Sequence, residues 1–128
     1  MKHLPNIVGA LLGLAFIAFG LMYFLKMMPD QPPPPPDSAV AKFMGAFVPT
    51  GYLDFVKALE MLGGLLVAIP RTRNFGLLVL GPILINILAF HVFITKGAGL
   101  YDPPLIVLSV MAAYLLWSGR KAFAGLLR

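Results

Sequence analysis

The 128-residue sequence contains no cysteine, and charged residues make up only 12% of it. The absence of cysteine excludes thiol relays, disulfide exchange and iron–sulfur clusters within this chain. The scarcity of charge argues against an ordinary soluble domain, because hydrophobic residues reach 59%, where roughly 45 to 50% is usual. Together with a mean hydropathy of +0.89, the composition predicts an integral membrane protein.

Acidic residues are the scarcer charged type, with five Asp and Glu against ten Lys and Arg. A net charge of +5 is compatible with nucleic-acid binding, but the basic residues sit at the ends of hydrophobic runs and form no interleaved patch. Membrane topology explains this distribution better. We therefore expect membrane lipid, and no nucleic acid, as a partner.

Long uncharged runs predict four membrane-spanning helices, since about 20 apolar residues cross a bilayer. The predicted spans are residues 5–28, 52–69, 75–95 and 103–119. The expected fold is all-α: an antiparallel four-transmembrane-helix bundle forming a single membrane domain over residues 1–128, with a short interfacial helix between spans one and two. Residues 29–37, PDQPPPPPD, end the first span and form a stiff spacer; the alternative is a proline-rich ligand for a partner domain.

The basic residues predict the orientation of the bundle. They occur at the start of the chain, in the turn with Arg71 and Arg73, and in the tail with Arg120, Lys121 and Arg128, and no Asp or Glu lies among them. By the positive-inside rule, the side that carries them is cytoplasmic. We therefore predict a multi-pass protein of the cell (inner) membrane with cytoplasmic N- and C-termini.

Glu60 is the acidic residue that lies deepest in a predicted span. A charged side chain near the bilayer centre costs at least about 2.5 to 3.5 kcal/mol on insertion scales, so it normally faces a polar interior, finds a partner or carries a proton. Lys57 precedes it by three residues and can reach it along one helix face. Glu60 is therefore predicted to have a functional or a buried structural role.

Three further polar residues are expected near Glu60. In antiparallel spans, Asn86 lies at the level of Glu60, and His91 lies closer to the outer face. The candidate polar cluster in the outer half of the membrane comprises Glu60, Lys57, Asn86, His91 and Tyr101. No metal site is expected, because a lone membrane histidine is more often a hydrogen-bonded structural residue than a ligand.

Glycines mark the predicted helix contacts. Gly9, Gly13 and Gly20 are spaced by four and seven residues and so share one face of the first span. This spacing is typical of a packing seam, although glycine is also frequent in membrane helices generally. Gly63 and Gly64, which follow Glu60 by three and four residues, allow another helix or a ligand to come close.

The order of these elements resembles the DoxX family. The similarity covers nearly the whole chain and is strongest from Phe43 to Phe93. It rests on an outer segment with Phe43 and Pro49, the run Glu60-Met61-Leu62-Gly63-Gly64, the Arg71/Arg73 turn, and a third span that ends in Asn86 to His91. Members of that family are small four-helix membrane proteins, some of them subunits of quinone-linked oxidoreductases. The resemblance implies that Glu60 matches the family's membrane glutamate.

Two functions follow as expectations. The first is an accessory subunit of a quinone-linked electron-transport system, in which an outer-half pocket around Glu60 binds a quinone or a lipid. Such a protein has no intrinsic cofactor, needs a redox partner and is not an enzyme on its own. The alternative is a membrane assembly or interaction protein in which Glu60 is a buried structural lock and the glycine faces pack helices of this chain, of a homo-oligomer or of another protein. A transporter or channel ranks last, because one acidic residue and four short spans offer little material for a gated path.

Overall fold

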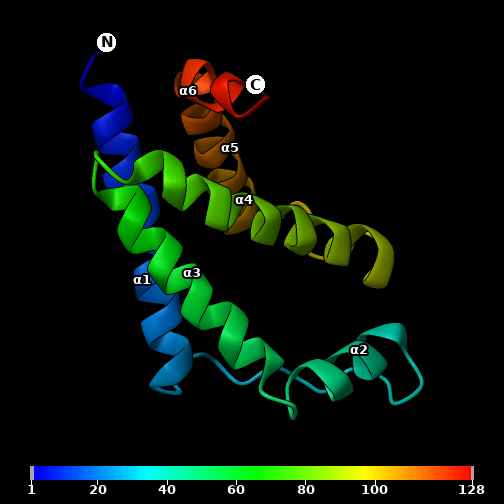
Figure 1. Cartoon of the computed structure of the whole chain (residues 1–128). Coiled ribbons are helices and arrows are strands. Elements are labelled where there is room, and N and C mark those ends of the chain that lie inside the picture. The colour runs from blue at the N-terminus through cyan, green and yellow to red at the C-terminus, as the bar shows by residue number, and fades with distance from the viewer. Residues whose placement is uncertain (1, 128) are drawn as a thin grey trace.

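The computed structural model describes residues 2–127, and every regular element in this range is helical (Figure 1). The expected all-α class is therefore confirmed. In chain order the elements are α1 (Leu4–Phe24), α2 (Ala39–Phe47), α3 (Tyr52–Ala68), α4 (Arg73–Ala89), the π-helical turn η1 (Phe90–Ile94), α5 (Pro103–Ser118), α6 (Arg120–Ala124) and the 3-10 turn η2 (Gly125–Leu127). Arg128, which the sequence analysis places in the basic tail, lies outside the described residues.

Two of the four predicted spans are long and apolar enough to cross a membrane. These are α1, with 21 residues, and α4 continued by η1, with 22 residues. The other two are shorter, since α3 has 17 residues and α5 has 16. At about 1.5 Å per residue they measure roughly 25 Å, which is less than the hydrocarbon core of about 30 Å.

Two helix boundaries differ from the predicted ones by more than a single residue. The first helix ends at Phe24 and not at residue 28, because Lys26 adopts a left-handed backbone conformation with φ of +58°. The N–H of Lys26 then donates to the carbonyl of Tyr23, which closes the helix. At the other boundary, α4 begins at Arg73 and not at residue 75. The side chain of Arg73 therefore belongs to the helix, and it is buried.

Helices α1 and α3 run side by side in opposite directions (Figure 1). They meet at Gly13 and Gly64, where a β-carbon on Gly13 would clash with the carbonyl oxygen of Gly64. In return, a β-carbon on Gly64 would lie 2.8 Å from the carbonyl oxygen of Gly13 and 2.9 Å from Cβ of Phe16. The two backbones can approach this closely only because both positions lack a side chain.

Gly63 gives α3 a second close neighbour, α4. A β-carbon on Gly63 would lie 2.7 Å from the side chain of Leu80, and one on Gly76 would lie 2.9 Å from the carbonyl oxygen of Gly63. Consecutive glycines of α3 thus face different helices. The buried hydrophobic core surrounds these two contacts and consists of Leu12, Phe16, Val67, Leu77, Leu80, Leu84, Ala112 and Leu115.

Beyond these contacts, α4 diverges from α3, so the four long helices do not lie parallel along their whole lengths (Figure 1). The short helix α2 lies at the opposite end of the molecule from the N- and C-termini (Figure 1). A short helix was predicted between spans one and two, and α2 is that helix; none of its residues is buried. Aromatic rings attach it there: Phe43 lies 5.1 Å from Phe90, and Phe47 lies 5.1 Å from Tyr52, between ring centroids. Its first turn is capped by the hydroxyl of Ser38, which accepts from the N–H of Ala41.

We expect Gly64→Ala to destabilise the fold by about 1 to 3 kcal/mol, because the added methyl group must force α1 and α3 apart. Thermal unfolding of the purified protein in detergent measures this. The matched control is Gly81→Ala in α4, where an added β-carbon would meet nothing within 4 Å. Equal melting temperatures for the two variants would contradict the assigned role of the Gly13 and Gly64 contact.

Candidate functional site

The carboxylate of Glu60 is buried in α3, with only 6% of the residue exposed. Its ionic partner lies on the same helix, since Lys57 Nζ is 3.5 Å from Glu60 Oε2. Lys57 is itself partly exposed, so its ammonium group links the buried carboxylate to the surface of the helix pair. The spacing of three residues along a helix, visible in the sequence, produces this pair.

The polar contacts continue from Lys57 to the exposed end of α3. Lys57 Nζ lies 5.8 Å from the centroid of the Tyr23 ring, within the range of a cation–π interaction. The Tyr23 hydroxyl donates to Asp54 Oδ1 at 2.6 Å, which ties the end of α1 to the start of α3. These four residues form a polar line from exposed Asp54 to buried Glu60. The role of Tyr23 cannot be predicted from the sequence, because a tyrosine near the end of an apolar run gives no signal of a specific partner.

Among the described residues, no hydrogen bond or ion pair joins Asn86, His91 or Tyr101 to Glu60. Asn86 is exposed, and its amide donates to the carbonyl oxygen of Pro82 one turn earlier, at 2.8 Å. His91 lies in η1 with Nδ1 3.0 Å from the carbonyl oxygen of Ile87, and Tyr101 is 80% exposed. The physical reason is the divergence of α4, which carries its second half away from α3 (Figure 1).

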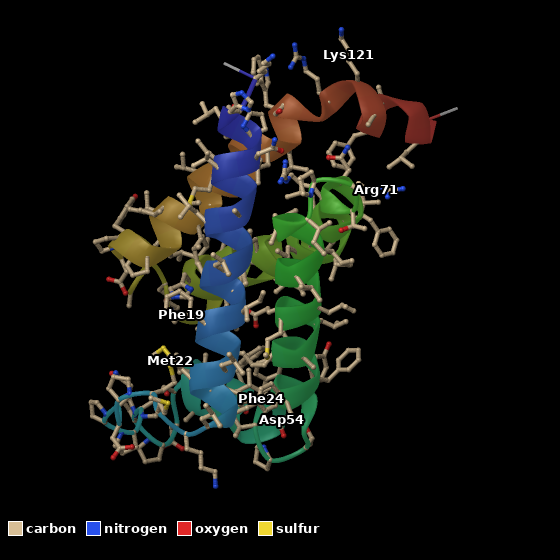
Figure 2. All side chains as sticks on the ribbon, turned by 90° about the vertical axis from the view of Figure 1, so that its left-hand side faces the viewer. Phe19, Met22, Phe24, Asp54, Arg71 and Lys121 are labelled. Carbon is tan, nitrogen blue, oxygen red and sulfur yellow. The ribbon has the colours of Figure 1, made fainter. Side chains whose placement is uncertain are left out.

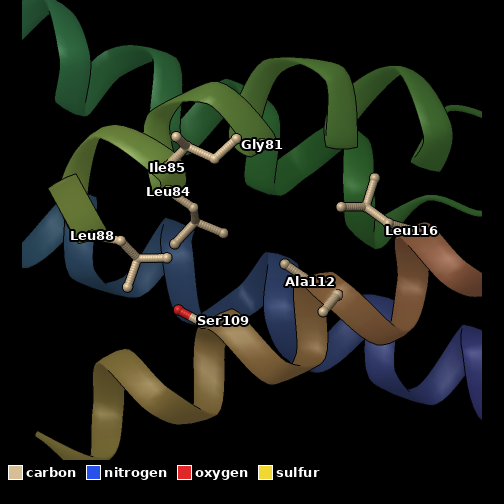
Figure 3. A pocket seen from close by; sticks show the side chains of 8 residues that line it. Gly81, Leu84, Ile85, Leu88, Ser109, Ala112 and Leu116 are labelled. Atoms are coloured by element: carbon tan, nitrogen blue, oxygen red, sulfur yellow. The ribbon is translucent and has the colours of Figure 1, made fainter. Parts of the chain in front are cut away.

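An apolar hollow lies between α4 and α5 (Figure 3). It has a volume of about 130 Å³ and opens to the surface of the two helices. Ser109 Oγ is buried there and has no hydrogen-bond partner among the described residues. The lining residues are Gly81, Leu84, Ile85, Leu88, Ser109, Ala112, Ala113 and Leu116.

A second hollow is a shallow groove of about 480 Å³ at the start of α3, lined by Thr50, Gly51, Tyr52 and Phe55. Neither hollow is lined by Glu60. A pocket was predicted around Glu60, whereas the apolar hollow described above lies between α4 and α5. Among residues 2–127, no group of three or more His, Asp or Glu side chains is arranged to hold a metal ion.

Arg73 is a buried cation that the sequence analysis treated only as part of a basic turn. It is 8% exposed, and its Nε donates to the carbonyl oxygen of Val67 at 2.9 Å, at the end of α3. Its Nη1 donates to Asn6 Oδ1 on α1, also at 2.9 Å. A β-carbon on Gly9 would clash with this guanidinium group, so the glycine makes room for it. Arg73 therefore joins three helices.

The five predicted packing glycines all lie at helix contacts, although their neighbours differ. Gly13 and Gly64 face one another, and Gly63 faces α4. Gly9 adjoins Arg73, and Gly20 adjoins the side chain of Met61. The glycine face of α1 is thus divided among a backbone contact, a cation and a thioether.

Comparison with known proteins yields one distant relative. The chain is 29% identical over 132 aligned residues to the uncharacterized protein YwoB of Bacillus subtilis (strain 168), and the alignment covers 99% of this chain and 84% of that protein. No family model matches the chain, and no solved structure matches it. The similarity to YwoB supplies no activity, and the DoxX resemblance continues to rest on the sequence motifs alone.

We expect Arg73→Leu to lower the free energy of unfolding by about 2 to 4 kcal/mol, because two charge-assisted hydrogen bonds are lost and the Val67 and Asn6 acceptors lose their donor. Denaturant or thermal unfolding in detergent measures the loss. Arg71→Leu is the matched control, since Arg71 is exposed on the same turn. A loss of stability as large for the control as for Arg73→Leu would show that charge, and not the buried contacts, is what matters.

Proposed function

We propose that the chain is a multi-pass membrane protein with four spans. The supporting observation is that large apolar side chains are exposed along all four long helices, including the two short ones. In water such continuous apolar surface is avoided, whereas lipid covers it without cost. These side chains include Ile7, Leu11, Leu14 and Leu21 on α1; Phe55, Leu62 and Leu65 on α3; Phe75, Leu78 and Ile85 on α4; and Val107, Val110 and Trp117 on α5. Local thinning of the bilayer accommodates α3 and α5.

The distribution of charge supports an orientation with both termini in the cytoplasm. Arg71 and Lys121 lie at one end of the molecule, and Asp54 lies at the other (Figure 2). Both ends of the described chain lie near the basic end (Figure 1). By the positive-inside rule this end faces the cytoplasm, and α2 with the proline segment faces outward.

Within the membrane, the protein acts by association with other membrane components and has no chemistry of its own. The observation that carries this proposal is the pairing of Glu60 with Lys57, three residues away and 3.5 Å apart. A buried carboxylate with its own counterion, next to glycines engaged in helix contacts, has the features of a structural lock. The DoxX resemblance supports a place beside a quinone-linked electron-transport system, as an accessory subunit.

A second candidate function is binding of an apolar ligand such as a quinone or a lipid, and the hollow between α4 and α5 favours it. The hollow is lined mainly by apolar side chains, measures about 130 Å³ and opens to the helix surface, so it offers an apolar ligand a partly open contact surface. The free Ser109 hydroxyl would donate a hydrogen bond to a carbonyl oxygen of the ligand. This places the ligand away from Glu60 and makes Glu60 dispensable for binding.

The proposed orientation can be tested with introduced cysteines, because the chain has none of its own. We expect Gln31→Cys to react with a membrane-impermeant maleimide in cells whose outer envelope has been made permeable to the reagent while the inner membrane stays intact. Gly125→Cys should react only after the membrane itself is permeabilised. Equal labelling of both positions before permeabilisation, or the reverse order, would refute the orientation.

The lock and the ligand site can be separated by melting temperatures in detergent, measured with and without an added quinone. For the lock, we expect Glu60→Gln and Lys57→Gln each to cost about 2 kcal/mol. The double variant should cost at least about 0.5 kcal/mol less than the sum of the two. Asp30→Asn in the exposed proline segment is the control. Additive losses would show that the two side chains do not act as a pair.

In the same experiment, a quinone that binds between α4 and α5 raises the melting temperature of the wild type, since a ligand stabilises the state it binds. Ala113→Leu, at an exposed residue that lines the hollow, should abolish this rise while Glu60→Gln keeps it. A rise that is kept in Ala113→Leu and lost in Glu60→Gln would instead place the ligand site at Glu60. No rise in any variant would eliminate the quinone as a ligand.

A further inference from the structure

We propose that the basic end of the molecule binds the phosphate groups of anionic membrane lipids. This surface is formed by cationic side chains from four separate segments: the start of the chain, the turn between α3 and α4, the first turn of α4, and α6. The described members are Lys2, Arg71, Arg73, Arg120 and Lys121. The proposal rests on the membrane location given above and is independent of the roles assigned to Glu60 and to the α4–α5 hollow.

Specific contacts bring these segments together. Arg73 reaches α1 through its hydrogen bond to Asn6, 2.9 Å long. The junction of α5 and α6 lies against the start of α4, since a β-carbon on Gly119 would be 2.7 Å from Asn74 Oδ1. As a result α6 and the turn with Arg71 occupy the same end of the molecule (Figure 2).

This end carries no opposing charge. Its five described cations are accompanied by no Asp or Glu, whereas the remainder of the described chain has four lysines and five carboxylates, a net charge of −1. The ion pair between Lys57 and Glu60 lies within α3 and involves none of these five cations. Among residues 2–127, no anionic side chain at this end neutralises these cations.

Arg73, the buried member of this surface, also lacks an anionic partner among the described residues. Its two acceptors, Val67 and Asn6, are neutral groups, and its Nη2 is buried with no hydrogen-bond partner among the described residues. A buried cation without a counter-charge is unfavourable. A lipid phosphate bound at this end would supply a counter-charge, and guanidinium groups match phosphate geometry well.

The location of the surface identifies the phosphate as that of a lipid. Trp117 lies at the end of α5 and packs against Arg120, whose guanidinium carbon is 4.1 Å from the ring centroid. Tryptophan and arginine at the end of an apolar helix are typical of the headgroup level of a membrane. Basic clusters at that level attract anionic lipids.

The test uses the full chain in mixed micelles that contain phosphatidylglycerol or, at the same concentration, phosphatidylcholine. We expect phosphatidylglycerol to raise the melting temperature by about 4 °C more than phosphatidylcholine does. The variant Arg71→Gln with Lys121→Gln should lose at least half of this difference, and added salt should reduce it. Native mass spectrometry should show a matching loss of retained phosphatidylglycerol.

The matched control removes two cations from the opposite end, with Lys42→Gln and Lys96→Asn. Asparagine is used at the second position because Lys96 has φ of +57°, which asparagine tolerates. This control should keep the full difference between the two lipids. An equal loss in the control, or no difference between the lipids for the wild type, would overturn the proposal. A rise of the same size with inorganic phosphate would overturn the lipid assignment, and none of these outcomes bears on the stability test of Glu60 and Lys57.

Discussion

The fold depends on the close approach of α3 to two other helices at Gly63 and Gly64. Inside a membrane, apolar side chains gain little from leaving lipid for protein, so helix association relies on van der Waals contact at small residues. Gly64 gives α3 a backbone contact with α1, and Gly63 gives it one with α4. The buried core is assembled around these two contacts. The pair of glycines therefore makes α3 the central helix, although it is shorter than α1 and carries a buried carboxylate.

Both glycine contacts lie toward the turn between α3 and α4, and this position shapes the other end of the molecule. The contacts of α4 with Gly63 involve Gly76 and Leu80. Beyond them α4 diverges from α3 and carries Asn86, and the following turn η1 carries His91. At the divergent end, different interactions hold the chain together: the Tyr23 and Asp54 hydrogen bond and the aromatic contact between Phe43 and Phe90. The divergence of α4 from α3 thus begins beyond the glycine contacts.

This geometry explains which features could be predicted from the sequence. The helices follow from uncharged runs bounded by proline and charge, and the Lys57 and Glu60 pair follows from a spacing of three residues along one helix. Both are local effects. The angle between α3 and α4 depends on contacts between distant residues, and one sequence does not encode it in any period or motif. The burial of Arg73 was missed for a similar reason, since the positive-inside rule counts charges and does not indicate where each side chain points. Gly9 leaves space for the guanidinium group of Arg73. In the sequence alone, Gly9 has the appearance of a glycine that packs against another helix.

The two buried charges of the described chain are Glu60 and Arg73, and their partners differ in kind. Glu60 has an ionic partner on its own helix, so its charge is balanced whether or not another molecule is present. Among the described residues, Arg73 has only a carbonyl and an amide oxygen as acceptors. Glu60 therefore has a counter-charge within the chain, while Arg73 has none among the described residues. Because a buried charge that lacks a counterion gains most from an external one, the strongest dependence of this protein on its surroundings is expected at Arg73 and not at the glutamate that dominates the sequence.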